Sequence, residues 1–299
     1  MVVIDTEVSI DKKYLPMTIE VPSNWESISP KICVFLTHGA GGDKDFHQLV
    51  ALSIKLAESG YMCARFTCKG LNIKYRTRAY VEVVRHVCLK YSSLTGCVFA
   101  GRSMGSCAAH MAANCISKSP NQPKSEISDK HSEQTLQPAK RKRKHSERNS
   151  KCDVKPKPDL CENCHAVHPP SCNTLGVICL SYPLHPVGGK ELRSQPILEA
   201  NVPVIFLSGT NDDMCDLPTL ETILTTAFSN QVSCKLTQWK NKSDLNSTCL
   251  FKINTPTGLG CIASLDNAIH SLKVKGLDDD VVIASVCEVV LSWLQRILP

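Results

Sequence analysis

The sequence predicts an α/β domain in which helices cover both faces of a mostly parallel sheet. Two observations lead to this fold class. Short continuous apolar runs, typical of strands buried on both faces, alternate with segments whose apolar residues recur at helical spacing. The length of 299 residues, with 42% hydrophobic and 21% charged residues, suits a globular chain and excludes a wholly disordered or fibrous one. We therefore expect a single domain over 1–299.

Before the middle of the chain, the pattern predicts strand 32–37, helix 46–59, strand 61–66, helix 76–91, strand 96–100 and a helix that ends near 116. Gly60 stands where the C-cap of the first helix belongs. After residue 172, the pattern predicts strand 175–181, strand 202–208, helix 217–228, strand 232–239 and helix 281–298. Three aspartates at 278–280 place negative charge at the start of the last helix, as its dipole favours.

Residues 118–172 interrupt this alternation. They hold twelve Lys or Arg against seven Asp or Glu, a net charge of +5, whereas the rest of the chain carries only +1. With few apolar side chains, the segment cannot bury enough surface to offset its ordering entropy, so we interpret it as a disordered basic insertion. The basic run from Lys140 to Lys144 is typical of a nuclear import signal and equally of a solvated charge cluster. Binding of nucleic acid is not expected, because no recognition helix or stacking aromatics accompany the run.

The insertion also holds residue types that bind zinc, namely Cys161, Cys164, His165, His168 and Cys172. One Cys-x-x-Cys half of a zinc motif is present, but no second half completes it. These residues therefore either form an incomplete zinc site or are thiols and imidazoles of an unstructured segment. We expect the protein to have no cofactor.

The seventeen cysteines occur without a basic and then apolar leader, so we expect a protein that is cytoplasmic, nuclear or both and is not secreted. No apolar run approaches the ~20 residues that a membrane-spanning helix needs, so a membrane is not an expected partner.

Gly101-Arg-Ser-Met-Gly105 is a G-x-S-x-G pentapeptide between a predicted strand and a predicted helix of small residues. This context is typical of the nucleophile elbow, the tight turn that presents the serine of α/β-hydrolases. Glycines suit the turn because it is strained and its flanks pack closely. The alternative is an ordinary strand-to-helix turn with a capping serine. We expect Ser103 to be a nucleophile.

A nucleophilic serine needs an orienting acid and a base, which follow it in that order in α/β-hydrolases. Asp212 comes just after the predicted strand 202–208, where sites of such sheets assemble, with Asp213 as the second choice. Either aspartate could instead cap the following helix. The predicted base is His270, the only histidine after residue 185, although a lone histidine is more often structural.

His38-Gly-Ala-Gly-Gly42 follows the first predicted strand. Such a loop can offer a backbone N–H to an oxyanion, here from Ala40, beside the N–H of Met104. Phosphate binding, the other use of a glycine loop, lacks support because neither G-x-x-x-x-G-K-[ST] nor G-x-G-x-x-G is present.

Several segments together resemble a known family: Leu36-Thr-His-Gly-Ala-Gly, Arg65-Phe-Thr-Cys-Lys-Gly, Gly101-Arg-Ser-Met-Gly-Ser, Ile178-Cys-Leu-Ser-Tyr-Pro-Leu-His, Ser208-Gly-Thr-Asn-Asp-Asp-Met-Cys and Ile269-His-Ser-Leu-Lys-Val-Lys-Gly. They are similar to the α/β-hydrolase-like family of testis-expressed protein 30 and of subunit 3 of the NSL histone acetyltransferase complex. The resemblance covers nearly the whole chain outside the insertions. It implies the α/β-hydrolase fold and a triad of Ser103, Asp212 and His270. Two stretches depart from the family, the 118–172 insertion and an extra loop at 241–264 just before His270.

These observations favour a serine hydrolase that acts on a small ester, thioester or amide. The alternative is a catalytically inactive scaffold whose partner is a nuclear, chromatin-associated protein complex, as the resemblance allows. A third hypothesis places zinc or nucleic-acid binding in the insertion.

Overall fold

The computed structural model describes residues 1–117, 172–188, 191–228, 249–257 and 259–298. Within these residues the chain forms one nine-stranded sheet in the order β1-β2-β4-β3-β5-β6-β7-β9-β8. The strands are β1 (Val2–Ile10), β2 (Lys13–Val21), β3 (Ile32–Thr37), β4 (Met62–Phe66), β5 (Gly96–Arg102), β6 (Asn173–Leu180), β7 (Val204–Gly209), β8 (Phe251–Thr257) and β9 (Gly260–Leu265). The helices are α1 (His47–Glu58), α2 (Ile73–Lys90), α3 (Met104–Ser117), α4 (Gln195–Leu198), α5 (Leu217–Phe228) and α6 (Asp279–Ile297), with a 3-10 turn at Trp25–Ser27.

The centre of the sheet is parallel, and its two edges are antiparallel. Strands β4, β3, β5, β6, β7 and β9 pair in parallel, whereas β2 joins β4 and β8 joins β9 in antiparallel fashion. Every residue of β3, β4, β7 and β9 is buried, as expected for strands covered on both faces. The prediction of a mostly parallel sheet is confirmed.

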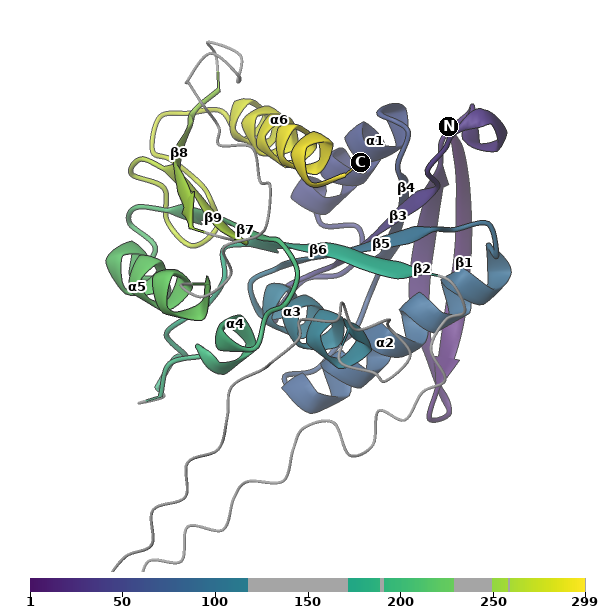
Figure 1. The fold of residues 1–299 in the computed structure, drawn as a ribbon, viewed down its shortest axis with the longest axis horizontal. Coiled ribbons are helices and arrows are strands. Elements are labelled where there is room, and N and C mark those ends of the chain that lie inside the picture. The colour runs from purple at the N-terminus through teal and green to yellow at the C-terminus, as the bar shows by residue number, and fades with distance from the viewer. Residues whose placement is uncertain (118–171, 189–190, 229–248, 258, 299) are drawn as a thin grey trace, which may run out of the picture.

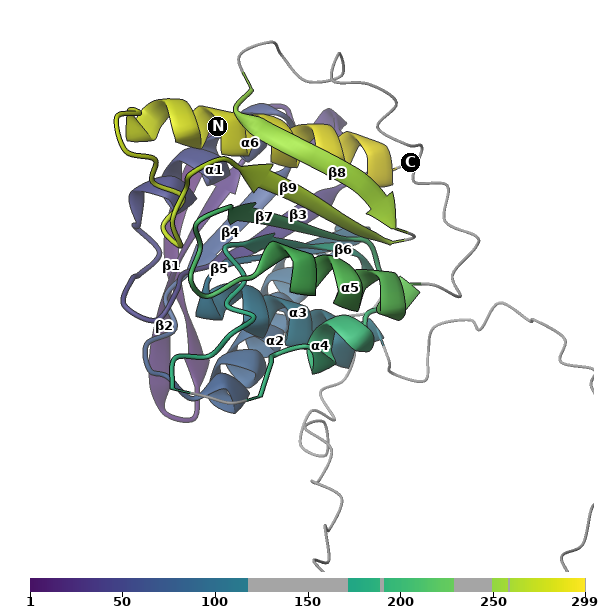
Figure 2. The same ribbon diagram turned by 90° about the vertical axis from the view of Figure 1, so that its left-hand side faces the viewer.

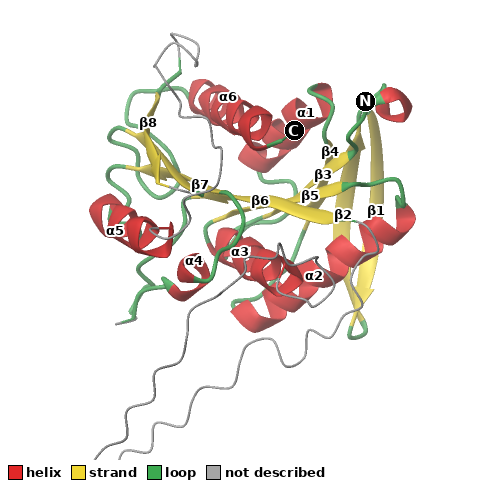
Figure 3. Cartoon of the chain, in the orientation of Figure 1, coloured by secondary structure: helices red, strands yellow, loops and turns green. Residues whose placement is uncertain are grey.

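Helices cover both faces of this sheet (Figure 1, Figure 3). Helices α1 and α6 pack on one face, over a cluster that includes Leu52 and Trp293. Helices α2, α3, α4 and α5 pack on the other, over a cluster that includes Tyr80 and Phe206. Figure 2 shows the sheet from its side, between these two layers. The apolar side chains that recur at helical spacing in these helices therefore face the sheet, as in other three-layer α/β folds.

The structure adds elements that the sequence pattern did not predict. The first two strands form an antiparallel hairpin, in which Val2 pairs with Val21. The stretch 241–264, expected to be an extra loop, instead supplies β8 and most of β9, so that expectation was wrong for residues 251–257 and 260–264. Antiparallel pairing of β8 with β9 extends the sheet beyond β7. The strand predicted over 232–239 lies outside the described residues.

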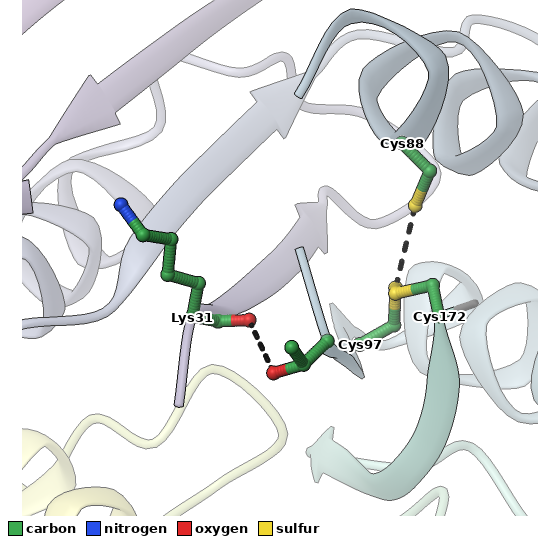
Figure 4. Close-up of a disulfide and its surroundings, with 5 residues drawn as sticks. Lys31, Cys88, Cys97 and Cys172 are labelled. Atoms are coloured by element: carbon green, nitrogen blue, oxygen red, sulfur yellow. Dashed lines mark hydrogen bonds between the residues drawn. A yellow bond between two sulfur atoms is a disulfide. The ribbon is translucent and has the colours of Figure 1, made fainter. Parts of the chain in front are cut away.

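Most of the predicted insertion also lies outside the described residues, including the basic run at 140–144. Its last residue, Cys172, is described and forms a disulfide with Cys97 (Figure 4). The remaining cysteines of the described part that carry free thiols are mostly buried. Among the described helices, none combines the length and apolar character that crossing a bilayer requires.

Candidate active site

Ser103 lies in a tight turn between β5 and α3. Its φ is +51°, a left-handed backbone conformation that residues other than glycine rarely adopt. The turn is fixed on both sides of the residue: the Ser103 N–H donates to Leu180 O at 2.8 Å, and the Ser106 hydroxyl donates to Ser103 O at 2.5 Å. The strained backbone therefore has local support, as in a nucleophile elbow.

The two glycines of the pentapeptide are required by close approach. A Cβ on Gly101 would lie 2.3 Å from the carbonyl carbon of Gly105. A Cβ on Gly105 would lie 2.5 Å from His38 O in the loop after β3. These contacts bring the start of α3 directly against the loop that carries Ala40.

Ser103, His270 and Asp212 form one hydrogen-bonded chain, although each follows a different strand. The Ser103 hydroxyl lies 2.8 Å from His270 Nε2, and His270 Nδ1 lies 2.9 Å from both carboxylate oxygens of Asp212. One tautomer satisfies all contacts, with Nδ1–H donating to the carboxylate and Nε2 accepting from the hydroxyl. The side chain of Asp212 is fully buried, and that of His270 is one-fifth exposed. This geometry lets the imidazole take a proton from the hydroxyl.

The two aspartates that the sequence offers as the acid differ in position and contacts. Asp212 is buried and also accepts the Met214 N–H at 2.9 Å, while the Ser208 hydroxyl lies 3.4 Å away. Asp213 is exposed and lies on the wall of an open cavity of about 480 Å³ beside the loop. Helix α5 is capped by neither, since Asp216 accepts the Thr219 N–H at its start.

Two backbone donors next to Ser103 are free of partners. In the described part of the chain, no acceptor takes the N–H of Ala40 or of Met104. Ala40 is exposed in the loop after β3, and Met104 is the first residue of α3. Both N–H groups are therefore available to an acceptor that the described residues do not supply.

The loop after β3 is held by two side chains whose roles the sequence analysis missed. Arg76 of α2 donates to His38 O, Gly39 O and Gly70 O, at 2.8–2.9 Å. The imidazole of His38 lies 2.6 Å from Gly39 O through Nδ1, and its Nε2 accepts the Cys68 N–H at 2.9 Å. Burial, assisted by the Arg76 charge, lowers the pKa of His38 to about 4, so this imidazole stays neutral. No motif signals these roles, because the acceptors of Arg76 are backbone carbonyls, two of them far away in sequence.

The loop that carries His270 is held differently. Gln48 of α1 donates from its amide to Ser271 O at 3.0 Å. Backbone bonds complete the support, with Asn211 N–H donating to Ala268 O at 2.9 Å and Leu272 N–H to Ile269 O at 2.8 Å. The same Gln48 accepts from Arg102 Nε at 3.2 Å, so it connects the histidine loop to the nucleophile elbow.

Of the residues considered for a metal, only Cys172 lies within the described chain. It belongs to a cluster of three cysteines, Cys88, Cys97 and Cys172. The disulfide joins Cys97 to Cys172, and Cys88 keeps a free thiol whose sulfur lies 3.6 Å from that of Cys97 (Figure 4). Cys161, Cys164, His165 and His168 lie outside the described residues, so the proposed zinc motif stays a prediction.

Comparison with known proteins supports the fold. Residues 162–244 match the family model described as an alpha/beta hydrolase domain, a range that includes Asp212 but neither Ser103 nor His270.

Three solved structures illustrate the likeness. Esterase 2 of Thermogutta terrifontis, phosphorylated by paraoxon, has a TM-score of 0.59 at 12% identity, over 99% of this chain and 94% of that one. A serine hydrolase without lid from Xanthomonas campestris has a TM-score of 0.55 at 10% identity, over 99% and 95%. A dienelactone hydrolase from Anabaena variabilis has a TM-score of 0.54 at 11% identity, over 99% and 98%. The chain therefore has the α/β-hydrolase fold.

Proposed function

We propose that the protein is a serine hydrolase that cleaves a small ester, thioester or amide. The observation that carries the proposal is the hydrogen-bonded chain from Ser103 through His270 to Asp212. Such a chain, at the carboxyl ends of parallel strands and beside two free backbone donors, has the parts that acyl transfer needs.

In the proposed mechanism, Ser103 Oγ attacks the carbonyl carbon of the substrate while His270 Nε2 takes the hydroxyl proton. Asp212 keeps the proton on Nδ1 and stabilises the imidazolium that forms. The N–H groups of Ala40 and Met104 bind the tetrahedral oxyanion, where one such donor is worth ~3–4 kcal/mol. His270 then protonates the leaving group, and water hydrolyses the acyl-enzyme by the same route.

Labelling with a fluorophosphonate tests this proposal. We expect wild-type protein to be labelled and Ser103→Ala protein to remain unlabelled. Ser59→Ala, which changes an exposed serine at the end of α1, is the matched control and should label like wild type. Absence of labelling in folded wild type would overturn the proposal and favour the inactive scaffold.

Asp212→Asn tests the role of the acid separately. An amide here can force the imidazole into the wrong tautomer, and we expect labelling or turnover to fall roughly 10⁴-fold, as in serine protease triads. Circular dichroism of the variant shows whether the fold is kept. A folded variant with unchanged rate would remove Asp212 from the mechanism.

A further inference from the structure

Arg102, the residue before the nucleophile, differs from the other two arginines near the site. Arg76 donates all its bonds to backbone carbonyls, and Arg65 is paired with the buried carboxylate of Glu20 at 2.5 Å. Arg102 donates only from Nε, to Gln48. Within the described chain, no carboxylate oxygen lies within 4.0 Å of its guanidinium.

The Arg102 guanidinium is held in place rather than free in solvent. The side chain is half-buried, and Cζ lies 4.9 Å from the centre of the Phe46 ring, a cation–π contact. Burial lowers the pKa of Arg102, while the charge of Asp212 acts in the opposite direction, so the group remains a cation. Its two terminal nitrogens have no partner among the described residues, and neither is sealed from solvent. A cation held in this way can gain a charge-assisted bond without losing an internal one.

The guanidinium also borders the reaction site. The position of a Cβ on Gly39 is 3.4 Å from Arg102 Nη1 and 3.2 Å from Ser103 Cβ. The next residue, Ala40, offers one of the two proposed oxyanion donors. A short acyl chain bound to Ser103 Oγ therefore has the guanidinium within reach of its far end.

We propose that Arg102 is a specificity residue that binds a carboxylate on the acyl group, so that preferred substrates are half-esters or half-thioesters of short dicarboxylic acids. This inference rests on the proposed serine hydrolase function. The two terminal N–H groups of a guanidinium match the two oxygens of a carboxylate, which favours this anion over a neutral acyl chain.

Matched substrate pairs test the inference. The anionic substrates are the mono-4-nitrophenyl esters of succinate and glutarate, and their neutral counterparts are 4-nitrophenyl butyrate and pentanoate. In wild type we expect kcat/KM, corrected for spontaneous hydrolysis, to be higher for at least one anionic ester than for its counterpart. Arg102→Gln should lower that ratio about 10–100-fold, as loss of a charge-assisted bond predicts. Arg102→Lys should retain part of the preference, because it keeps the charge.

A purely structural role for Arg102 would give a different result. In that case Arg102→Gln would lower the rates for both substrates equally and leave the ratio unchanged, which overturns the inference. Arg85→Gln, which removes an exposed charge from α2, is the control for a general loss of positive charge. Preference of wild type for both neutral esters would likewise overturn the inference while leaving the serine hydrolase function intact.

A binding measurement avoids any need for turnover. Calorimetry of succinate binding to Ser103→Ala protein should show binding that Ser103→Ala/Arg102→Gln protein loses. If succinate does not bind, or if inorganic phosphate binds equally well, the carboxylate assignment is wrong. Fluorophosphonate labelling of wild type reports separately on the serine hydrolase function, so the two failures are distinguishable.

Discussion

Two loops meet at the candidate site, and they are anchored by different chemistry. The loop after β3, which carries Ala40, is tied back by the buried charge of Arg76 and by the neutral imidazole of His38. The loop after β9, which carries His270, is tied by peptide hydrogen bonds and by the uncharged side chain of Gln48. The first loop should therefore respond strongly to loss of its buried charge, whereas the ion pairs of Asp266 and Lys273 in the second loop are about half exposed and should contribute little.

Among the tests of this difference between the loops, removal of the Arg76 guanidinium should change the free energy of unfolding most. Arg76→Met would leave the carbonyls of His38, Gly39 and Gly70 without their donor, and His38 is almost completely buried. We expect the free energy of unfolding to fall by about 3 kcal/mol or more. Denaturant titration measures the change.

Arg78→Met on the same helix is the control for that variant, since Arg78 is partly exposed and paired with Asp11 at the surface. Its loss should be below about 1 kcal/mol. Similar losses in the two variants would show that Arg76 is not the anchor of the loop.

Acid should act on the same loop with a smaller effect. The pKa of His38 is about 4 in the folded chain, against about 6.5 for a free imidazole. The unfolded chain therefore takes up a proton below pH 6.5 that the folded chain does not bind until near pH 4. The contribution of neutral His38 to the free energy of unfolding is fully present above pH 6.5. It falls as pH drops through this window, by about 2–3 kcal/mol at pH 4.5.

His110 on α3 adds a comparable loss over the same window, because burial lowers its pKa to about 3 and neither of its ring nitrogens has a partner in the described chain. Comparing unfolding of wild type and His38→Asn across pH isolates the contribution of His38, since both proteins keep His110. If the two proteins lost stability in parallel between pH 6.5 and 4.5, His38 would not be the group that responds.

Removal of Gln48 should affect the other loop and should change rate more than stability. Gln48→Ala loses the bond to Ser271 O and would let His270 move relative to Ser103. We expect the fluorophosphonate labelling rate to fall about 10-fold, with an unfolding free energy changed by about 1 kcal/mol. Gln195→Ala, which removes an exposed glutamine on α4, is the control. Equal labelling rates would mean that the backbone bonds alone position the base.

The smallest effect is expected at an exposed ion pair between the histidine loop and α6. Lys273 contacts Asp279 at 2.6 Å, and both side chains are about half exposed. Lys273→Ala should change stability by less than about 0.5 kcal/mol, and even that difference should disappear in high salt. A loss above 1 kcal/mol would show that charge anchors this loop as well.

How far the fold could be predicted depended on the kind of strand. The parallel strands β3, β4, β5, β6 and β7 consist mostly of apolar residues, and the sequence pattern located them, whereas the buried parallel strand β9 was missed. The edge strands β1 and β8, together with β2 next to the edge, mix polar and apolar residues, and their place is decided by antiparallel pairing partners that a linear pattern does not reveal. For this reason, β8 was expected to be part of a loop although it pairs with β9 in a hairpin.

In the candidate site, only residues that belong to a known motif or follow a known chain order could be predicted. Ser103 has such a motif, and chain order points to His270. The choice of Asp212 over Asp213 depends on which carboxylate is buried, a difference of one position along the chain. The supporting residues Arg76 and Gln48 act on backbone carbonyls, and any residue can supply a carbonyl, so no residue pattern marks them.

The contact between Gly101, Gly105 and the carbonyl of His38 has a consequence for mutational tolerance. Selection for folded protein alone should reject almost every substitution at these two glycines, whether or not the protein is an enzyme. Position 103 should behave in the opposite way, because its left-handed φ makes glycine an easier residue than serine for folding. Intolerance at 101 and 105 therefore reports on architecture, and only a requirement for serine at 103 would report on chemistry.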